Sequence, residues 1–280
     1  MAQPGVLYVV ATPIGNLEDL SPRAREVLAA ADLVAAEDTR HSAALLSHFG
    51  IHTPLVSLHE YNEAERSAEL LAKLRDGARV ALVSDAGTPL ISDPGFDLVR
   101  AARRAGVTVT PIPGACALVA ALSVSGLPTD RFVFEGFLPA KSTARRARLA
   151  ELAPETRTLV FYESVHRLRE SLEDMAVAFG PGRPAVLARE LTKLHEGVRE
   201  ATLAVLAEWA GRDPAAAKGE VVLVVAGSPE AAVSDAEADR ILKALLVELP
   251  VKQAASLAAA ITGLKKNSLY QRALELTGKQ

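Results

Sequence analysis

The chain has 280 residues, 49% of them apolar, and a formal net charge of −3 at pH 7, which suggests one large or two ordinary domains with ample core material. No apolar run approaches the roughly 20 residues of a membrane span, and no basic segment precedes the short apolar run near the N-terminus, so we expect a cytoplasmic protein. The single cysteine excludes an internal disulfide and a cysteine-based zinc site, and the slight acidity does not suggest a strongly basic nucleic-acid-binding domain.

Strands and helices are predicted to alternate in a first domain, residues 1–113. Short apolar runs predict strands at 5–11, 33–36, 55–58, 79–83 and 107–111. Helical spacing and capping residues predict helices at 21–31, 39–49, 62–75 and 95–104; Ser21 with Pro22 is a typical helix start. Repeated strand–helix units indicate an α/β fold with a parallel sheet covered by helices on both faces.

A second α/β domain is predicted over residues 114–230, and a helical tail over 234–280. The second domain carries apolar strands at 131–136, 158–162, 185–189, 198–202 and 220–226, the last two close enough for antiparallel pairing, so we expect a mixed sheet. Three apolar stripes with breaks near Gly263 and 265–267 predict a helix-turn-helix-like tail. The pattern fits a packing role for this tail as well as RNA binding.

The segment 83–95, VSDAGTPLISDPG, is the most informative of the chain. It follows a strand that reads as buried on both faces, and Asp93 with Pro94 can begin the next helix. Strand–helix connections usually run about two to six residues, and longer ones tend to be functional. Ligands of open α/β sheets bind at the carboxyl ends of strands, so we interpret this segment as a ligand loop rather than an ordinary Gly/Pro turn.

The loop after the first strand, ATPIGNLED at 11–19, excludes two common nucleotide sites. A dinucleotide-binding fold would place G-x-G-x-x-G here, whereas this chain has only Gly15 and a proline at Pro13. No P-loop motif occurs anywhere in the chain. Other segments after predicted strands supply Glu37 and Asp38, and the small residues around Gly114, although helix capping and tight packing would explain these residues equally well.

Polar residues follow two strands of the second domain, in FYESVHRL at 161–168 and ARELTKLHEG at 188–197. Their concentration at strand ends predicts acid–base or anion-binding groups, although each residue alone is more often solvated or salt-bridged. No set of histidines and carboxylates has metal-ligand spacing, so we expect no metal. The basic segment at 141–148, KSTARRAR, is predicted to be a mobile loop that contacts RNA phosphate; the alternative is the start of an exposed helix.

Six segments in this order resemble one family: VATPIGNLEDLSPRA, AEDTR, VSDAGTPLISDPG, PIPGACALVAAL, FYESVHR and ARELTK, followed by the helical tail. They are similar to the bacterial 16S rRNA cytidine-2′-O-methyltransferases of the tetrapyrrole-methylase superfamily, over nearly the whole chain. The resemblance implies two α/β domains with S-adenosylmethionine in the cleft between them, a homodimer, and 16S rRNA of the small ribosomal subunit as substrate. Tetrapyrrole-modifying relatives carry GxGPG in the first loop; the TPIGN of this chain favours the rRNA branch.

The strand-end segments and the resemblance together predict the site residues. The expected cofactor-binding residues are Pro13, Gly15, Asp85, Ala86, Gly87, Thr88, Ile91, Ser92, Gly114, Ala115, Ala117 and Tyr162. Glu163, Lys193 and Arg189 are the catalytic candidates, because a carboxylate can accept the ribose proton and a cation can steady the oxyanion. Two alternatives stay open: a methylase of this fold acting on a tetrapyrrole or other small molecule, and a non-catalytic RNA-binding or ribosome-assembly factor.

Overall fold

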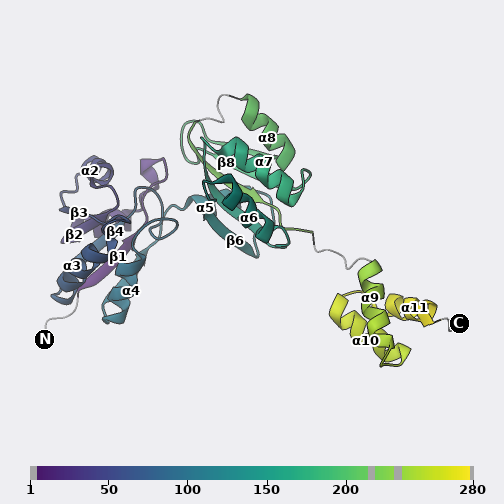
Figure 1. Ribbon diagram of the computed structural model, residues 1–280. Coiled ribbons are helices and arrows are strands. Elements are labelled where there is room, and N and C mark those ends of the chain that lie inside the picture. Colours follow the sequence, from purple (N-terminus) through teal and green to yellow (C-terminus); the bar gives the residue numbers. More distant parts are fainter. Residues whose placement is uncertain (1–4, 214–217, 230–234, 278–280) are drawn as a thin grey trace. The chain divides into compact units, whose positions relative to one another are not determined.

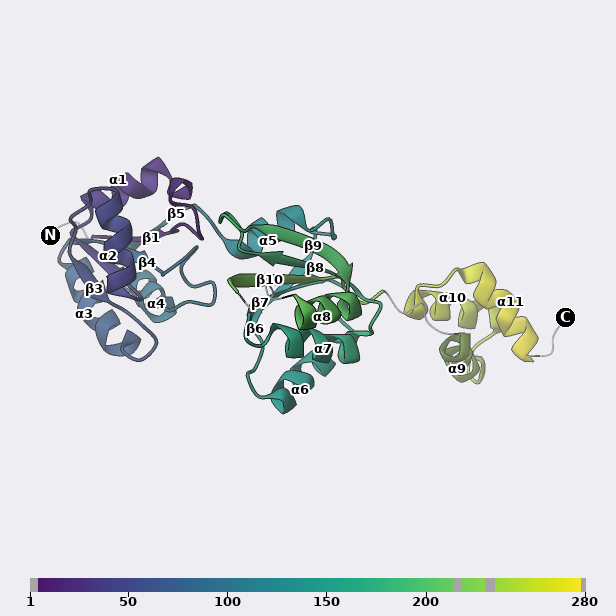
Figure 2. The same cartoon turned by 90° about the horizontal axis from the view of Figure 1, so that it is seen from above.

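The computed structural model describes residues 5–213, 218–229 and 235–277 (Figures 1 and 2). They belong to two compact units, Met1–Gly227 and Ser228–Gln280. The first unit contains two five-stranded sheets. The second is helical.

The first sheet is parallel throughout, as predicted, with strand order β3-β2-β4-β1-β5. Two helices cover each of its faces: the buried side chains of α1 and α2 pack on one, and those of α3 and α4 on the other. Because helices cover both faces, the side chains on both sides of each strand are buried. The strands therefore carry unbroken apolar runs. Its elements are β1 (Val6–Val10), α1 (Pro22–Ala30), β2 (Leu33–Ala36), α2 (Thr39–His48), β3 (Leu55–Ser57), α3 (Glu63–Arg75), β4 (Arg79–Val83), α4 (Phe96–Arg104) and β5 (Thr108–Ile112).

The second sheet is mixed, again as predicted, with strand order β6-β7-β10-β8-β9; the two strands expected to pair, β9 and β10, are instead separated by β8. Only β6 and β7 pair in parallel; the other neighbours are antiparallel. Because β10 runs against β7 and β8, its first residues lie beside the last residues of those strands, with Glu220 opposite Ser164. The elements are α5 (Ala117–Val124), β6 (Phe132–Phe137), α6 (Ser142–Leu152), β7 (Thr158–Ser164), α7 (Leu168–Phe179), β8 (Pro184–Arg189), β9 (Gly197–Thr202), α8 (Leu203–Arg212) and β10 (Glu220–Val225).

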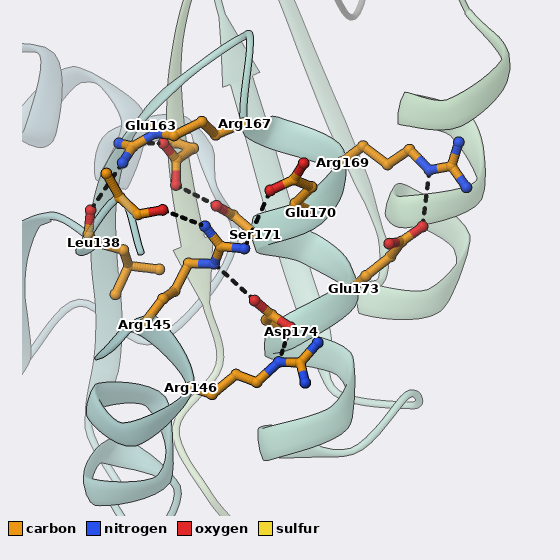
Figure 3. A network of polar contacts seen from close by, with 11 residues as sticks. Leu138, Arg145, Arg146, Glu163, Arg167, Arg169, Glu170, Ser171, Glu173 and Asp174 are labelled. Atoms are coloured by element: carbon orange, nitrogen blue, oxygen red, sulfur yellow. Dashed lines mark hydrogen bonds and ion pairs between the residues drawn. The ribbon is translucent and has the colours of Figure 1, made fainter. Parts of the chain in front are cut away.

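The basic segment, residues 141–148, is not the mobile loop that its composition predicted. It begins helix α6, and Arg145 is only 2% exposed (Figure 3). The Arg145 Nε donates to one carboxylate oxygen of Asp174 at 2.7 Å, and the Arg146 Nε donates to the other at 2.6 Å. Arg148 pairs with Glu135 on β6 and with Glu151. The prediction failed because most of these acidic partners are distant in sequence.

The second unit is a bundle of α9 (Asp235–Leu246), α10 (Val251–Thr262) and α11 (Lys266–Thr277), which confirms the predicted helical tail. Its core consists of small and aliphatic residues, among them Leu242, Ala258 and Leu269. Gly263 ends α10 at a φ of 71°, a left-handed conformation that favours glycine. Ser234, where the tail was expected to begin, lies outside the described residues. Among the described helices, none has the length and apolar character needed to cross a membrane.

Candidate functional site

A cavity of about 480 Å³ lies at the carboxyl end of β4, between the ligand loop (residues 84–95) and the ends of β7 and β10. Its volume is within the usual range for small-molecule sites. The wall combines small residues, aliphatic and aromatic side chains, and carboxylates. The lining residues are Ile14, Glu37, Asp85, Ala86, Gly87, Thr88, Ile91, Ser92, Asp93, Ala117, Phe137, Tyr162, Glu163, Ser164, Val165, His166, Ala188, Leu191, Gly219, Glu220, Val221 and Val222.

The ligand loop is held to the first loop of the chain by main-chain hydrogen bonds. The Thr12 N–H donates to the Gly87 carbonyl at 2.8 Å, and the Gly87 N–H donates back to Thr12 at 3.1 Å. The Thr88 hydroxyl donates to the carbonyl of Ala115 at 3.0 Å, which ties the loop to the start of α5. The loop therefore has a defined conformation although it contains no helix or strand.

Backbone strain is concentrated in two loops that adjoin this cavity. Leu90 and Ser92 of the ligand loop have φ values of 72° and 70°, and Glu190 and Thr192 after β8 have values of 51° and 66°. These are the non-glycine residues with positive φ in the described part of the chain. Such conformations cost free energy and cluster at ligand sites, where the surrounding structure maintains them.

Five carboxylates line the cavity. Glu163 and Glu220 pair with Arg167 and Lys193, whereas Glu37, Asp85 and Asp93 form no ion pair in the described part of the chain and make the cavity acidic. Burial, and then the neighbouring Asp85, raise the pKa of Glu37. Burial and the charge of Glu37 raise the pKa of Asp93 to about 6. Asp85 accepts the backbone N–H of Asp38 at 2.9 Å, which fixes its carboxylate at the start of α2. The mutual repulsion of these groups favours a ligand that carries positive charge.

A second cavity, of about 380 Å³, adjoins the first and shares Ile14, Asp85, Ala86 and Glu220 with it. Pro13, Gly15, His41, His48 and Lys193 are among its other lining residues. The Lys193 ammonium pairs with Glu190 at 2.9 Å and Glu220 at 3.0 Å. Burial opposes its charge, but the hydrogen bonds to those two carboxylates hold the pKa of Lys193 above its ordinary value.

Gly15 allows the first loop to approach Lys193 closely. A Cβ on Gly15 would come within 2.3 Å of the Lys193 Cγ and 3.0 Å of the Thr192 hydroxyl oxygen. That hydroxyl oxygen is buried and has no hydrogen-bond partner. Thr192 lines neither cavity, so its hydroxyl is a packing neighbour of Gly15 and not part of a cavity wall.

The structure brings most of the predicted cofactor residues to these two cavities. Asp85, Ala86, Gly87, Thr88, Ile91, Ser92, Ala117 and Tyr162 line the larger cavity, and Pro13 and Gly15 line the smaller. Gly114 and Ala115 line neither. A Cβ on Gly114 would lie 2.9 Å from the Ala11 Cβ, so tight packing explains that glycine.

Tyr162 is fixed at the wall of the larger cavity. Its hydroxyl oxygen accepts the Leu118 N–H at 3.2 Å, and its ring meets those of Phe134 and Phe137 edge-on. Burial raises the pKa of this phenol, so it is neutral at physiological pH. A neutral, immobilised ring suits a packing contact with a ligand better than proton transfer.

The carboxylate of Glu163 is directed away from the face that Tyr162 occupies, because neighbouring residues of a strand point to opposite faces. Glu163 is 3% exposed, and its carboxylate accepts the Ser171 hydroxyl at 2.5 Å (Figure 3). It also pairs with Arg167 at 2.9 Å, and Arg167 donates to the Leu138 carbonyl. Glu163 nevertheless lines the larger cavity, as expected, but its carboxylate oxygens already hold Ser171 of α7 and Arg167.

Arg189 lines neither cavity. Its guanidinium donates to the carbonyls of Lys218 and His195, at 3.3 and 3.4 Å, and so joins two loops.

The sequence did not predict three residues at the beginning of β10 that line the larger cavity, Gly219, Glu220 and Val221. Only carboxyl ends of strands were considered, whereas an antiparallel strand brings its amino end to the same edge.

Comparisons with known proteins agree with this architecture. The family described as Tetrapyrrole (Corrin/Porphyrin) Methylases matches residues 6–207, and the RsmI C-terminal HTH domain matches residues 232–277. A Pseudomonas aeruginosa protein named "Ribosomal RNA small subunit methyltransferase I" is 59% identical, over 98% of this chain and 99% of that protein.

Solved structures share the fold of the first unit. A uroporphyrin-III-C-methyltransferase from Thermus thermophilus is 27% identical, with a TM-score of 0.57 over 79% of this chain and 94% of that chain. A second uroporphyrin-III C-methyltransferase structure from that organism, complexed with S-adenosylhomocysteine, is 22% identical, with a TM-score of 0.53 over 79% of this chain and 97% of that chain. The chain therefore belongs to the tetrapyrrole methylase family and, within it, to the family of ribosomal RNA small subunit methyltransferase I.

Proposed function

We propose that this protein transfers a methyl group from S-adenosylmethionine to the ribose 2′-hydroxyl of a cytidine in 16S rRNA of the small ribosomal subunit. The observation that carries the proposal is the full-length similarity to a protein named for small-subunit rRNA methylation, which includes the helical tail. Tetrapyrrole methylases of this fold cover about four-fifths of the chain. We further propose that the protein acts in the cytoplasm, and the family resemblance leads us to expect a homodimer.

The residues of the larger cavity fit S-adenosylmethionine in size and charge. Its sulfonium and ammonium groups are cationic, and the cavity holds Glu37, Asp85 and Asp93. Because the pKa values of Glu37 and Asp93 are raised, a nearby positive charge would relieve unfavourable electrostatics. The apolar wall around Ile91 and Tyr162 suits the flat adenine ring.

When bound, S-adenosylmethionine supplies a methyl group on a sulfonium that is already a good leaving group. The protein must then align the acceptor oxygen with that methyl group and exclude water. The second cavity is the proposed place for the acceptor ribose, because it shares Asp85 and Ala86 with the cofactor cavity.

Lys193 is our main catalytic candidate. Its ammonium stays protonated beside Glu190 and Glu220, so it can stabilise negative charge that develops on the ribose oxygen but cannot act as a general base. His41 and His48 are the imidazoles at the second cavity that could receive the ribose proton. We assign Glu163 and Arg189 to positioning, through Arg167 and through two loop carbonyls respectively.

Methyl incorporation from labelled S-adenosylmethionine into three acceptors tests this proposal: unmethylated small ribosomal subunits, naked 16S rRNA and a tetrapyrrole. We expect label in ribosomal RNA, at one nucleotide whose backbone becomes resistant to alkali, since alkaline cleavage requires a free 2′-hydroxyl. Label in the tetrapyrrole alone would identify a small-molecule methylase. Tight binding to subunits without any transfer would identify a non-catalytic assembly factor.

A further inference from the structure

A third cavity, of about 490 Å³, lies between α3 and α4, the two helices on one face of the first sheet. None of its lining residues belongs to the two cavities described above. Its apolar surface comes from small residues and one leucine: Ala64, Ala68, Leu71, Ala101 and Ala105. The methyl side chains leave a groove between the two helices, which we call the arginine groove because Arg75, Arg100 and Arg104 complete its wall.

Ser67 indicates that this groove receives a polar ligand. It is 5% exposed and lines the groove, yet its hydroxyl oxygen has no hydrogen-bond partner. A buried hydroxyl without a partner destabilises the folded chain, so such groups in native proteins call for an explanation. A ligand oxygen in the groove would supply the absent partner.

The charges of the groove define the ligand's chemistry. Its three guanidinium groups face a single carboxylate, Asp97, which pairs with Arg100 at 2.7 Å. Arg75 and Arg104 form no ion pair within the described part of the chain. Guanidinium groups bind phosphate with two parallel hydrogen bonds, which makes arginine the preferred residue at phosphate sites.

We propose that the arginine groove binds the phosphodiester backbone of the RNA substrate, a contact that rests on the proposed function. The chain is acidic overall, so RNA affinity requires a local basic surface. The basic segment of α6 does not offer it, because Arg145, Arg146 and Arg148 are paired with carboxylates. The arginine groove combines two guanidinium groups without an ion pair in the described part of the chain, Arg75 and Arg104, with the unpartnered hydroxyl of Ser67.

The groove is also connected to the ligand loop. One carboxylate oxygen of Glu63, at the start of α3, accepts the N–H groups of Gly95 and Asp97, at 3.0 and 2.8 Å. The amino ends of both helices are thereby fixed to the end of the loop that lines the cofactor cavity. An RNA strand in the groove would thus be held against the same rigid unit that positions the cofactor.

The test measures binding of unmethylated small ribosomal subunits over a series of salt concentrations. The triple variant Arg75→Gln, Arg100→Gln, Arg104→Gln should bind about tenfold more weakly or worse. The slope of log affinity against log salt should become shallower by about 2, because three fewer phosphates are neutralised. The matched control replaces three exposed arginines of the second sheet's helices and loops, Arg157, Arg169 and Arg212, by glutamine; it removes the same charge and should keep the wild-type slope.

A second variant, Ser67→Ala, separates ligand binding from folding. Removal of an unpartnered buried hydroxyl should not destabilise the chain, so weaker subunit binding at unchanged thermal stability would support the groove. Equal salt slopes for the triple variant, its control and the wild type would overturn the proposal. So would a change in oligomeric state at unchanged RNA affinity, which would make the groove a self-association surface.

The wild-type measurements keep this proposal distinct from the proposed function. A wild-type chain that methylates subunits while the triple variant binds them normally would refute only the groove. A chain that binds subunits through the groove but transfers no methyl group would refute the proposed chemistry and support the RNA contact.

Discussion

The ligand loop and the basic segment of α6 have similar sequence signatures but opposite uses. Both are short stretches of distinctive composition, and both are expected from sequence to contact a ligand. The ligand loop lines a cavity with Ala86, Gly87 and carboxylates that have no cationic partner among the residues around it. The basic segment instead neutralises Asp174 and packs α6 on α7. A charged residue can pair with an opposite charge from any part of the chain, so its composition alone does not predict its role. Small residues in a strained loop are harder to explain by packing alone, so they are better indicators of a ligand site.

The largest effect that this comparison predicts concerns the buried pair of Arg145 and Asp174. Asp174→Asn should lower the free energy of unfolding by about 3–5 kcal/mol, because it leaves a buried guanidinium with the exposed Glu170 and the Ala140 carbonyl, each at 3.4 Å. Arg145→Met should cost less, since Asp174 keeps Arg146 as a partner. Denaturant titration measures both. A control at the exposed pair, Arg157→Gln, should stay within about 1 kcal/mol.

If Asp174→Asn were as harmless as the surface control, the basic segment would not be structural. Its arginines would then be available to RNA again, and the contrast with the ligand loop would fail.

The next effect compares two charged residues at the cavities, Lys193 and Glu163. Lys193→Met should lower methyl transfer under single-turnover conditions by about 10²-fold while the cofactor still binds, because it removes charge from the second cavity. Glu163→Gln should mainly lower the free energy of unfolding, because its carboxylate serves Ser171 and Arg167. Transfer rates and denaturant titrations of both variants check this pair. A Glu163→Gln variant with full stability and no transfer would restore Glu163 as a catalytic residue.

A smaller effect compares two alanines of the predicted cofactor site. Ala86→Val adds two methyl groups at a residue that lines both cavities, and should weaken S-adenosylmethionine binding by roughly tenfold to a hundredfold. Ala115 lines neither cavity, so Ala115→Val should leave binding close to the wild-type value. Calorimetric titration of both variants measures this. Equal affinities for Ala86→Val and the wild type would place the cofactor elsewhere.

The smallest effect is a difference in pH dependence between the two regions. Burial and Glu37 raise the pKa of Asp93 from 3.8 to about 6, so the stability that its protonated form contributes is lost as pH rises through about 6. Asp93→Asn should therefore become more stable than the wild type across that range, by about 1–2 kcal/mol at pH 7. For Asp174, burial is outweighed by hydrogen bonds from Arg146 and Arg145, which lower its pKa.

The contribution of ionised Asp174 to the free energy of unfolding should therefore be lost in the opposite direction, as pH falls below the ordinary range of an aspartate. Unfolding free energies of Asp93→Asn, Asp174→Asn and the wild type, measured from pH 4 to pH 8, compare the two signs. Parallel curves for Asp93→Asn and the wild type would mean that Asp93 ionises normally and that the cavity does not favour a cationic ligand.

Some features of the site needed only local sequence. Apolar runs, helix periodicity and caps predicted the alternating strands and helices of the first domain, because these signals act within each helix or strand. The rule that ligands bind at carboxyl ends of strands pointed to the loop at 84–95, which lines the larger cavity. Local sequence did not show that the Glu163 carboxylate, at the same cavity as Tyr162, is already held by Ser171 and Arg167.

The tertiary structure alone decided the rest, because it depends on residues that meet from distant parts of the chain. Asp174 lies far from Arg145 in sequence, and only the packing of α7 on α6 turns a basic segment into a buried ion pair. Glu220 reaches the cavities and Lys193 only because β10 runs antiparallel to β7 and β8. Local sequence therefore determined which elements form and where a ligand loop follows a strand, and long-range pairing determined which charged groups remain free to meet a ligand.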